Sequence, residues 1–295
     1  MFKIPDLRKR IVFTLLMFGV YRLGAAVPVP GVDLDAVQRL TESGTQAGIY
    51  GLLNLFSGGA LETFSVFALG IMPYITASII LQLLTVVIPR LQKLQEEGES
   101  GRKIITQWTR YVTVVLALLQ STGLTYIFSR GSLTGGISLI PNYTPSRVGL
   151  IVLTMTAGTA FIMWLGELIS QRGIGNGMSL IIFASIISQL PASFGGAYQV
   201  TAGQGRIGQF SVLVLMFFLM IVGIIYVEQG QRRIPIQFAK RVRGRKVMGG
   251  QSTYIPLKVN SAGVIPVIFA TSVLFFPALI ATSLPQDNRV TAGIR

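Results

Sequence analysis

Long stretches without a charged residue run through most of the chain. They comprise residues 11–21, 63–89, 111–129, 148–166, 173–205, 207–227 and 259–286, the first of which continues for ten residues past Arg22. A helix rises about 1.5 Å per residue, so roughly 20 apolar residues cross a hydrocarbon layer of about 30 Å. These stretches are apolar on every side instead of striped. All seven are therefore long enough to span a membrane.

The pattern predicts an all-α membrane protein that crosses the bilayer several times. The expected spans are residues 11–30, 68–88, 106–128, 148–168, 178–194, 207–227 and 261–283. Residues 1–10 precede the first span, and residues 228–258 form the largest loop.

The composition removes several classes of chemistry. The chain contains no Cys and no His, which excludes disulfides, thiolate zinc sites, cysteine nucleophiles, His-ligated metals and the Ser-His-Asp triad. Only 12% of its residues are charged, about half of the usual share. No lysine lies at membrane depth, so a Ser-Lys intramembrane protease is also disfavoured. We expect no enzyme activity, no metal and no cofactor.

The basic residues predict the orientation. If the N-terminus lies inside, 18 of the 25 Lys and Arg residues are on the inner side and seven on the outer side. This bias is the one that cytoplasmic loops carry. We therefore expect a cytosolic N-terminus, and the net charge of +14 mainly reflects topology. Arg22 interrupts the region where a leader peptide would be cleaved, which favours an uncleaved first helix with Arg22 reaching toward the headgroups.

Two segments differ from ordinary spans. Residues 54–64 are too short to cross and contain Ser57, Gly58 and Gly59. They form either an interfacial helix on the outer surface or a re-entrant segment that fills a cavity. In residues 173–205, Pro191 and the two glycines that follow interrupt the far end, so the expected helix is short. Short, broken helices point to a pathway between helix bundles.

Charged residues are rare inside the spans. Glu167 and Glu228 fall at inner ends, and no Asp, Glu or Lys lies in the middle of a span. Pumps and proton-coupled carriers usually keep such a group there, so the pattern favours a passive conduit. Neutral polar residues do occur within spans, and they either join helices or line a polar seam that can open. They include Thr76, Gln82, Gln120 and Asn260.

The largest inner loop is strongly basic. Residues 232–246 hold seven Lys and Arg and no acidic residue, more than a topology anchor needs. Such a loop meets anionic headgroups, RNA phosphates or an acidic protein face. Pro235, Gly244, Gly249 and Gly250 favour a turn or hairpin geometry over one continuous helix.

Four longer segments together resemble the SecY family of bacterial protein-translocation channels. They are FSGGALETFSVFALGIMPYITASIILQLLTVVIP (56–89), EEGESGRK (96–103), MWLGELISQRGIGNGMSLIIFA (163–184) and GGQSTYIPLKVNSAGVIPVIFA (249–270). The resemblance runs from about Ile4 to Leu284 in family order. It implies a channel bundle of ten spans in two pseudo-symmetric halves, with residues 11–205 as the first half of five helices and residues 207–295 as part of the second. Because the sequence stops just past the seventh span, we expect it not to close a pore by itself.

The resemblance also implies roles for individual residues. The pore ring would contain Ile71, Ile75, Ile182 and Ile268, with Met178 where the family often has a branched residue. The plug would consist of Leu55, Phe56, Ser57, Gly58, Gly59, Ala60, Leu61, Glu62, Thr63 and Phe64. The lateral gate would contain Thr76, Gln120 and Asn260, which would satisfy one another when the gate is closed. The partner-docking loop would present Arg232, Arg233, Lys240, Arg241, Arg243, Arg245 and Lys246.

The resemblance implies a function and partners as well. Secretory polypeptides would cross through the pore, and transmembrane segments would leave sideways into lipid. The expected partners are small membrane subunits of the SecE and SecG types, the SecA motor ATPase, the ribosome, signal sequences, nascent polypeptides and the lipid bilayer. The expected location is the bacterial plasma membrane. The alternative from the residues alone is a secondary transporter of a small solute, since broken helices also fit that class.

Overall fold

The computed structural model describes residues 5–33, 35–37, 54, 57–130, 139–140, 143–236, 241–243, 246–248, 253–261, 263, 266 and 270. The chain divides into two compact units. One consists of Met1–Ala192 with Phe269–Arg295, and the other of Ser193–Ile268.

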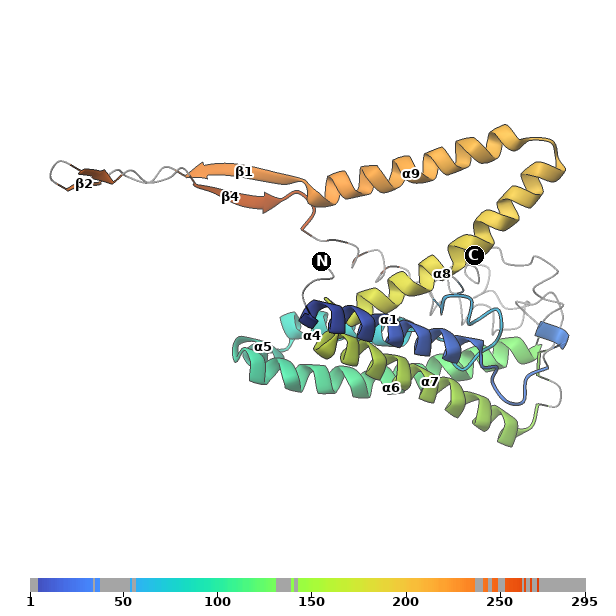
Figure 1. Ribbon diagram of the computed structural model, residues 1–295. Helices are drawn as coiled ribbons and strands as arrows, with labels where there is room; N and C mark the ends of the chain where they lie inside the picture. Colours follow the sequence, from blue (N-terminus) through green and yellow to red (C-terminus); the bar gives the residue numbers. More distant parts are fainter. Residues whose placement is uncertain are drawn as a thin grey trace, which may run out of the picture. The chain divides into compact units, whose positions relative to one another are not determined.

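The first unit is a helical bundle. Its helices are α1 (Pro5–Ala26), α4 (Met72–Val87), α5 (Pro89–Glu96), α6 (Glu99–Arg130), α7 (Pro145–Arg172) and the first part of α8 (Gly177–Gly203). Helix α7 packs beside both α1 and α6, and α4 packs on α6 (Figure 1). The chain bends by 101° between α4 and α5. Pro89 causes this bend because the residue before a proline is driven into the extended region, where Ile88 lies at φ −98°, ψ 112°.

The described helices fit a membrane protein. Four of them, α6, α7, α8 and α9 (Ile207–Gln229), are long and apolar enough to cross a membrane, and the bent pair of α4 and α5 makes a fifth if it is one span. Helix α1 extends back to Pro5 and so includes part of the basic N-terminus. Most of the expected seventh span, residues 261–283, lies outside the described residues.

Three expected helix boundaries are wrong. The helix predicted over residues 11–30 ends at Ala26, because the residue before Pro28 is driven out of the helical region. The helix predicted from residue 68 begins only at Met72, because Gly70 has a positive φ of 57° that an α-helix cannot contain. The predicted interruption at Pro191 does not occur, and α8 continues through it to Gly203. Proline removes one backbone hydrogen bond. Unwinding the whole turn would expose more unpaired backbone groups to a lipid environment that cannot satisfy them.

The second unit contains the end of α8, helix α9 and a β-hairpin. Two edge-to-face aromatic pairs join α8 to α9, Phe194 with Phe217 and Tyr198 with Phe210. Strand β1 (Gln231–Ile236) follows α9 directly and pairs antiparallel with β4 (Thr253–Lys258) (Figure 1). Strands β2 (Arg241–Arg243) and β3 (Lys246–Met248) form a second antiparallel pair. The predicted hairpin geometry is thus confirmed for the described part of the loop.

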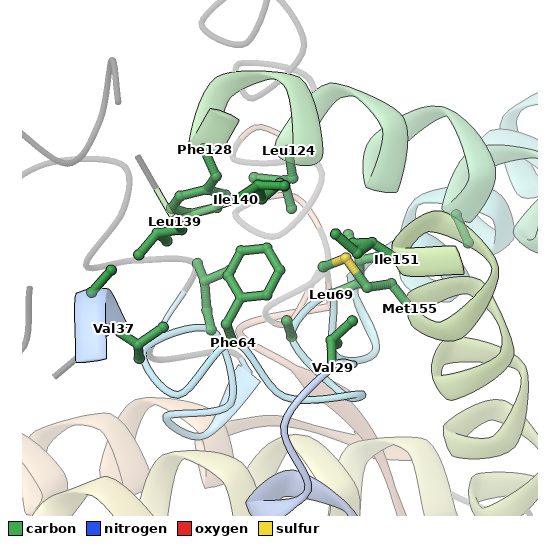
Figure 2. Packing of buried hydrophobic residues seen from close by; sticks show 14 residues of the cluster. Val29, Val37, Phe64, Leu69, Leu124, Phe128, Leu139, Ile140, Ile151 and Met155 are labelled. Atoms are coloured by element: carbon green, nitrogen blue, oxygen red, sulfur yellow. The ribbon is translucent and has the colours of Figure 1, made fainter. Parts of the chain in front are cut away.

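The core of the first unit consists of two apolar clusters. One gathers around Phe64 and includes residues of α6 and α7 (Figure 2). The other gathers Tyr21, Ile71, Ile162 and Ile181 from α1, α7, α8 and the turn before α4. Residues 57–71 contribute to both clusters, and this segment positions the candidate site.

Candidate functional site

Residues 57–71, which we call the turn segment, are a series of turns inside the first unit. Gly58, Gly59 and Gly70 have positive φ values of 67°, 85° and 57°. Phe64 has φ 45°, a conformation that bulky residues rarely adopt. Most of the segment is buried, with Ser57, Ala60, Leu61 and Phe64 at 1% exposure. The interpretation as an exposed interfacial helix is therefore wrong for these residues.

Helix α1 and the residues after it hold one side of the turn segment. The Tyr21 hydroxyl lies 3.1 Å from the carbonyl oxygen of Ser57, and Nη1 of Arg22 donates to the carbonyl of Gly58 at 3.1 Å. Two backbone hydrogen bonds add to these contacts. The Val29 N–H donates to Phe64 at 3.0 Å, and the Val66 N–H donates to Val27 at 2.9 Å.

Helices α7 and α8 approach the turn segment closely at three glycines. A Cβ atom on Gly158 of α7 would overlap the backbone carbonyl of Val66. A Cβ on Gly58 would lie 3.0 Å from the Cα of Ser185, and a Cβ on Gly59 would overlap the side chain of Gln189. Glycine thus serves twice in the segment, for its backbone conformation and for the absence of a side chain.

Phe64 anchors the segment in the apolar core. Its ring meets the ring of Phe128 edge to face, with centroids 5.0 Å apart. Figure 2 shows both rings among Leu139, Ile140 and other aliphatic side chains. Such an aromatic pair adds about 0.5–1.5 kcal/mol beyond its buried area. The segment is held by packing as well as by hydrogen bonds.

Polar contacts within the turn segment and with the nearby Asn54 satisfy several side-chain and backbone groups. The amide of Asn54 donates to Glu62 at 3.0 Å, and the N–H of Glu62 donates back to the Asn54 side-chain oxygen at 3.2 Å. The hydroxyl of Ser57 donates to the Asn54 carbonyl and accepts from the N–H of Leu61, both at 3.1 Å. Of the predicted plug residues, Leu55 and Phe56 lie outside the described residues.

Four of the five predicted ring residues lie in one apolar cluster. Ile71 is 2% exposed, and Ile75, Met178 and Ile182 pack partly buried against the same cluster. The α7–α8 contact there is close, since a Cβ on Gly166 would overlap the sulfur of Met178. The fifth predicted residue, Ile268, lies outside the described residues.

The three predicted gate residues divide between the two units. Thr76 is buried and donates to the carbonyl of Met72 at 3.0 Å, and Gln120 is buried in the same unit. Asn260 belongs to the second unit, where its amide donates to Glu228 at 3.0 Å. That these residues satisfy one another in a closed gate stays a prediction.

The two glutamates at inner helix ends both have partners that the sequence did not indicate. Glu167 accepts two hydrogen bonds from Arg110, at 2.7 and 2.6 Å, which links α7 to α6. Glu228 accepts from Asn260, which lies next to the end of β4. Within the described part of the chain, no three acidic side chains gather where they could hold a metal ion.

The predicted docking loop presents basic residues on the paired strands. Arg232 and Arg233 are exposed on β1, and the guanidinium of Arg233 lies 4.7 Å from the centre of the Tyr254 ring on β4. Arg241 and Arg243 belong to β2 and Lys246 to β3, whereas Lys240 and Arg245 lie outside the described residues.

Sequence analysis missed two residues of this site. Tyr21 and Ser185 are buried against each other with their hydroxyl oxygens 2.7 Å apart, although 164 positions separate them. Each is a neutral polar residue within an apolar run, the same signal that singled out Thr76 and Gln120. Nothing in the sequence indicated which hydroxyls would meet.

Comparisons with known proteins all lead to one family. Residues 65–293 match the SecY family. The protein translocase subunit SecY of Streptomyces scabiei is 52% identical over 297 residues, covering 99% of this chain and 67% of that protein. The protein of the same name from Streptomyces coelicolor is 53% identical over 302 residues, with the same two coverages. The chain thus spans about two thirds of the length of these relatives.

Solved structures share the fold. A structure described as a protein-conducting channel aligns with a TM-score of 0.63 at 18% identity, covering 96% of this chain and 60% of that chain. Sec61 in the canine ribosome–channel complex from the endoplasmic reticulum aligns with a TM-score of 0.62, with the same identity and coverages. A SecY structure whose plug domain is reported to stabilise the closed state aligns with a TM-score of 0.62 at 19% identity, covering 96% of this chain and 59% of that chain.

Proposed function

The chain belongs to the SecY family, and we propose that it is the channel-forming subunit of a protein translocase. In this function it passes unfolded secretory polypeptides across the membrane and releases transmembrane segments sideways into lipid. One observation carries the proposal. A buried turn segment, held by α1, α7 and α8, ends in Ile71 within the apolar cluster that also contains Ile75, Met178 and Ile182.

The chemistry of that cluster suits a channel that must hold back ions. Isoleucine and methionine side chains carry no charge. They therefore neither bind nor repel a passing polypeptide according to its charge, and can contact chains of any sequence. A narrow apolar ring also empties of water when nothing occupies it, which opposes ion leakage. We assign the ring to Ile71, Ile75, Met178, Ile182 and Ile268.

The first part of the turn segment, residues 57–64, would act as the plug together with residues 55 and 56. Residues 55–64 would block the outer side of the pore at rest and leave when a polypeptide enters. Positive φ values and turns make this segment separable from the regular helices around it. The lateral gate would be lined by Thr76, Gln120 and Asn260. A hydrophobic signal sequence would insert between the gate helices and replace the contacts that hold them together when the gate is closed.

The basic hairpin would dock cytosolic partners. Its exposed arginines complement RNA phosphates and acidic protein faces. The ribosome is one proposed partner, since Sec61 is found in a ribosome–channel complex. The SecA motor ATPase is the other, and small subunits of the SecE and SecG types would accompany the chain within the membrane.

The proposed location is the bacterial plasma membrane, with the N-terminus in the cytosol. The excess of basic residues on that side supports this orientation. The chain itself would catalyse no reaction, and the energy for movement would come from the docked partners.

Ion conductance of the complete translocase tests the pore assignment. Ile182→Asn in the full-length protein, reconstituted with its small subunits in vesicles, should raise the resting ion leak because a polar side chain hydrates the ring. Ile182→Leu keeps the ring apolar and should leave the leak unchanged. Equal leaks in both variants would contradict the pore assignment. Saturable uptake of a small solute, with no precursor translocation, would favour a transporter.

Binding experiments test the docking loop. Replacing Arg241, Arg243 and Arg245 by glutamate should weaken binding of ribosomes or the SecA motor at low salt. The same reversal at Arg90 and Lys93 of α5 is the control for overall charge on the inner side. Undiminished binding by the first variant would leave the loop as a topology anchor only.

A further inference from the structure

Two buried hydroxyls beside the turn segment share more acceptors than they have protons. Tyr21 Oη lies 3.1 Å from the Ser57 carbonyl and 2.7 Å from Ser185 Oγ. Ser185 Oγ in turn lies 2.8 Å from the carbonyl of Ile181. Tyr21 and Ser185 each have one hydroxyl proton. Three contacts of hydrogen-bond length are therefore served by two protons.

Three arrangements give each proton an acceptor, but one of them places no proton between the two hydroxyl oxygens, whose separation of 2.7 Å is that of a hydrogen bond. Two arrangements therefore remain. In the first, Tyr21 donates to the Ser57 carbonyl and Ser185 donates to Tyr21. In the second, Tyr21 donates to Ser185 and Ser185 donates to the carbonyl of Ile181, its own helix neighbour. The first arrangement binds the turn segment, and the second does not.

We propose that Tyr21 and Ser185 form a hydroxyl relay that holds the plug in the closed channel and releases it at low cost. This inference rests on the proposed function and names two positioning residues for it. With the turn segment in place the relay uses the first arrangement. When the plug residues leave, both protons shift to the second arrangement, so neither buried hydroxyl loses its acceptor.

Both hydroxyls are buried, so the loss of a hydrogen-bond acceptor would destabilise the protein. Tyr21 is 1% exposed and Ser185 fully buried, among the apolar side chains of the second cluster. A buried hydroxyl without an acceptor is unfavourable, because it has lost its hydrogen bonds to water and gained none in their place. The Ser57 carbonyl keeps only a long contact of 3.4 Å from the N–H of Ala60 if Tyr21 no longer donates to it. The relay thus removes a penalty that would otherwise fall on the open state.

Removing each hydroxyl separately should have opposite effects. Tyr21→Phe keeps the ring, which stacks on Phe67 with centroids 5.8 Å apart. It takes away the donor to Ser57, so the closed state is weakened and the resting ion leak rises about fivefold. Ser185→Ala leaves Tyr21 without an acceptor once the plug has left. It should therefore lower the open fraction on signal-sequence addition about fivefold, without raising the resting leak.

The experiment uses the full-length channel with its small subunits in planar bilayers, recording resting conductance and the conductance induced by a signal peptide. Two variants are matched controls. Ser188→Ala removes a half-buried hydroxyl of the same helix that donates to the carbonyl of Ser185, and Tyr198→Phe removes the hydroxyl of an exposed tyrosine of α8. Both should behave as wild type. Detergent melting of every variant establishes that it is folded.

The double variant tests whether the two hydroxyls act as one unit. With Phe at position 21 no hydroxyl remains to be stranded, so Ser185→Ala should have no further effect in that background. Additive effects, a raised leak in Ser185→Ala, or wild-type behaviour of both single variants would each overturn the relay. A channel that still translocates precursor and leaks with Ile182→Asn would then retain the proposed function. If the wild-type channel did not conduct after the signal peptide was added, the proposed function itself would be overturned.

Discussion

Gly158 lies where α7 passes closest to the turn segment, and its missing side chain makes that approach possible. We expect Gly158→Ala to destabilise the protein by about 1–3 kcal/mol, because a methyl group there must displace the Val66 backbone. Gly149 is the matched control, since it lies on the same helix with nothing within 4 Å of its position. Gly149→Ala should be neutral or slightly stabilising. Thermal unfolding in detergent measures both, and equal shifts would contradict the close contact.

Phe64 combines full burial with a left-handed backbone. Replacing it by alanine removes the contact with Phe128 and leaves a cavity, which typically costs about 3–5 kcal/mol for a buried phenylalanine. Because the loss lies within the residues proposed as the plug, we also expect a raised resting ion leak of the complete channel. Phe161→Ala is the control, since that ring is 39% exposed and should cost less. A leak unchanged in Phe64→Ala would show that Phe64 does not secure the plug.

At the scale of elements, a bidentate ion pair joins α6 to α7. Arg110 and Glu167 make two hydrogen bonds at 2.7 and 2.6 Å, and their side chains are 44% and 18% exposed. A double-mutant cycle with Arg110→Ala and Glu167→Ala should give a coupling of roughly 1 kcal/mol that falls as salt is added. The control pair is Arg10 and Asp6, whose charged groups lie 3.9 Å apart and whose side chains are 53% and 81% exposed. The same cycle on this exposed pair should give almost no coupling. Equal couplings would remove Arg110–Glu167 as a link between the helices.

Local chemistry predicted the elements well where neighbours in sequence decide the outcome. The absence of charge predicted most helices, and Pro235 with nearby glycines predicted a hairpin instead of a helix. Pro191 misled because its local cost was weighed without the greater cost of unwinding a helix in lipid. The turn segment was recognised as irregular, but its burial depends on partners such as Ser185 and Gly158, which are distant in sequence. Composition carries no information on those contacts.

At the scale of the whole molecule, the family resemblance contributed what single residues could not. It grouped Ile71, Ile75, Met178 and Ile182, which lie in one cluster of the structure. From the residues alone, isoleucines at these positions are ordinary core or lipid-facing side chains. The resemblance did not indicate Tyr21 and Ser185, because their pairing is a matter of three-dimensional geometry within this chain.

The absence of cysteine allows the orientation of the whole chain to be tested with single labels. Gln204 and Gln231 are exposed glutamines on either side of α9. The 23 residues of that helix correspond to about 35 Å, enough to cross the hydrocarbon layer. Because the basic hairpin follows Gln231, the distribution of charge predicts that Gln231 lies in the cytosol and Gln204 outside. In intact cells a membrane-impermeant maleimide should therefore label Gln204→Cys but not Gln231→Cys. Inverted membrane vesicles should reverse the result. Labelling of both positions from one side would mean that α9 does not cross the bilayer.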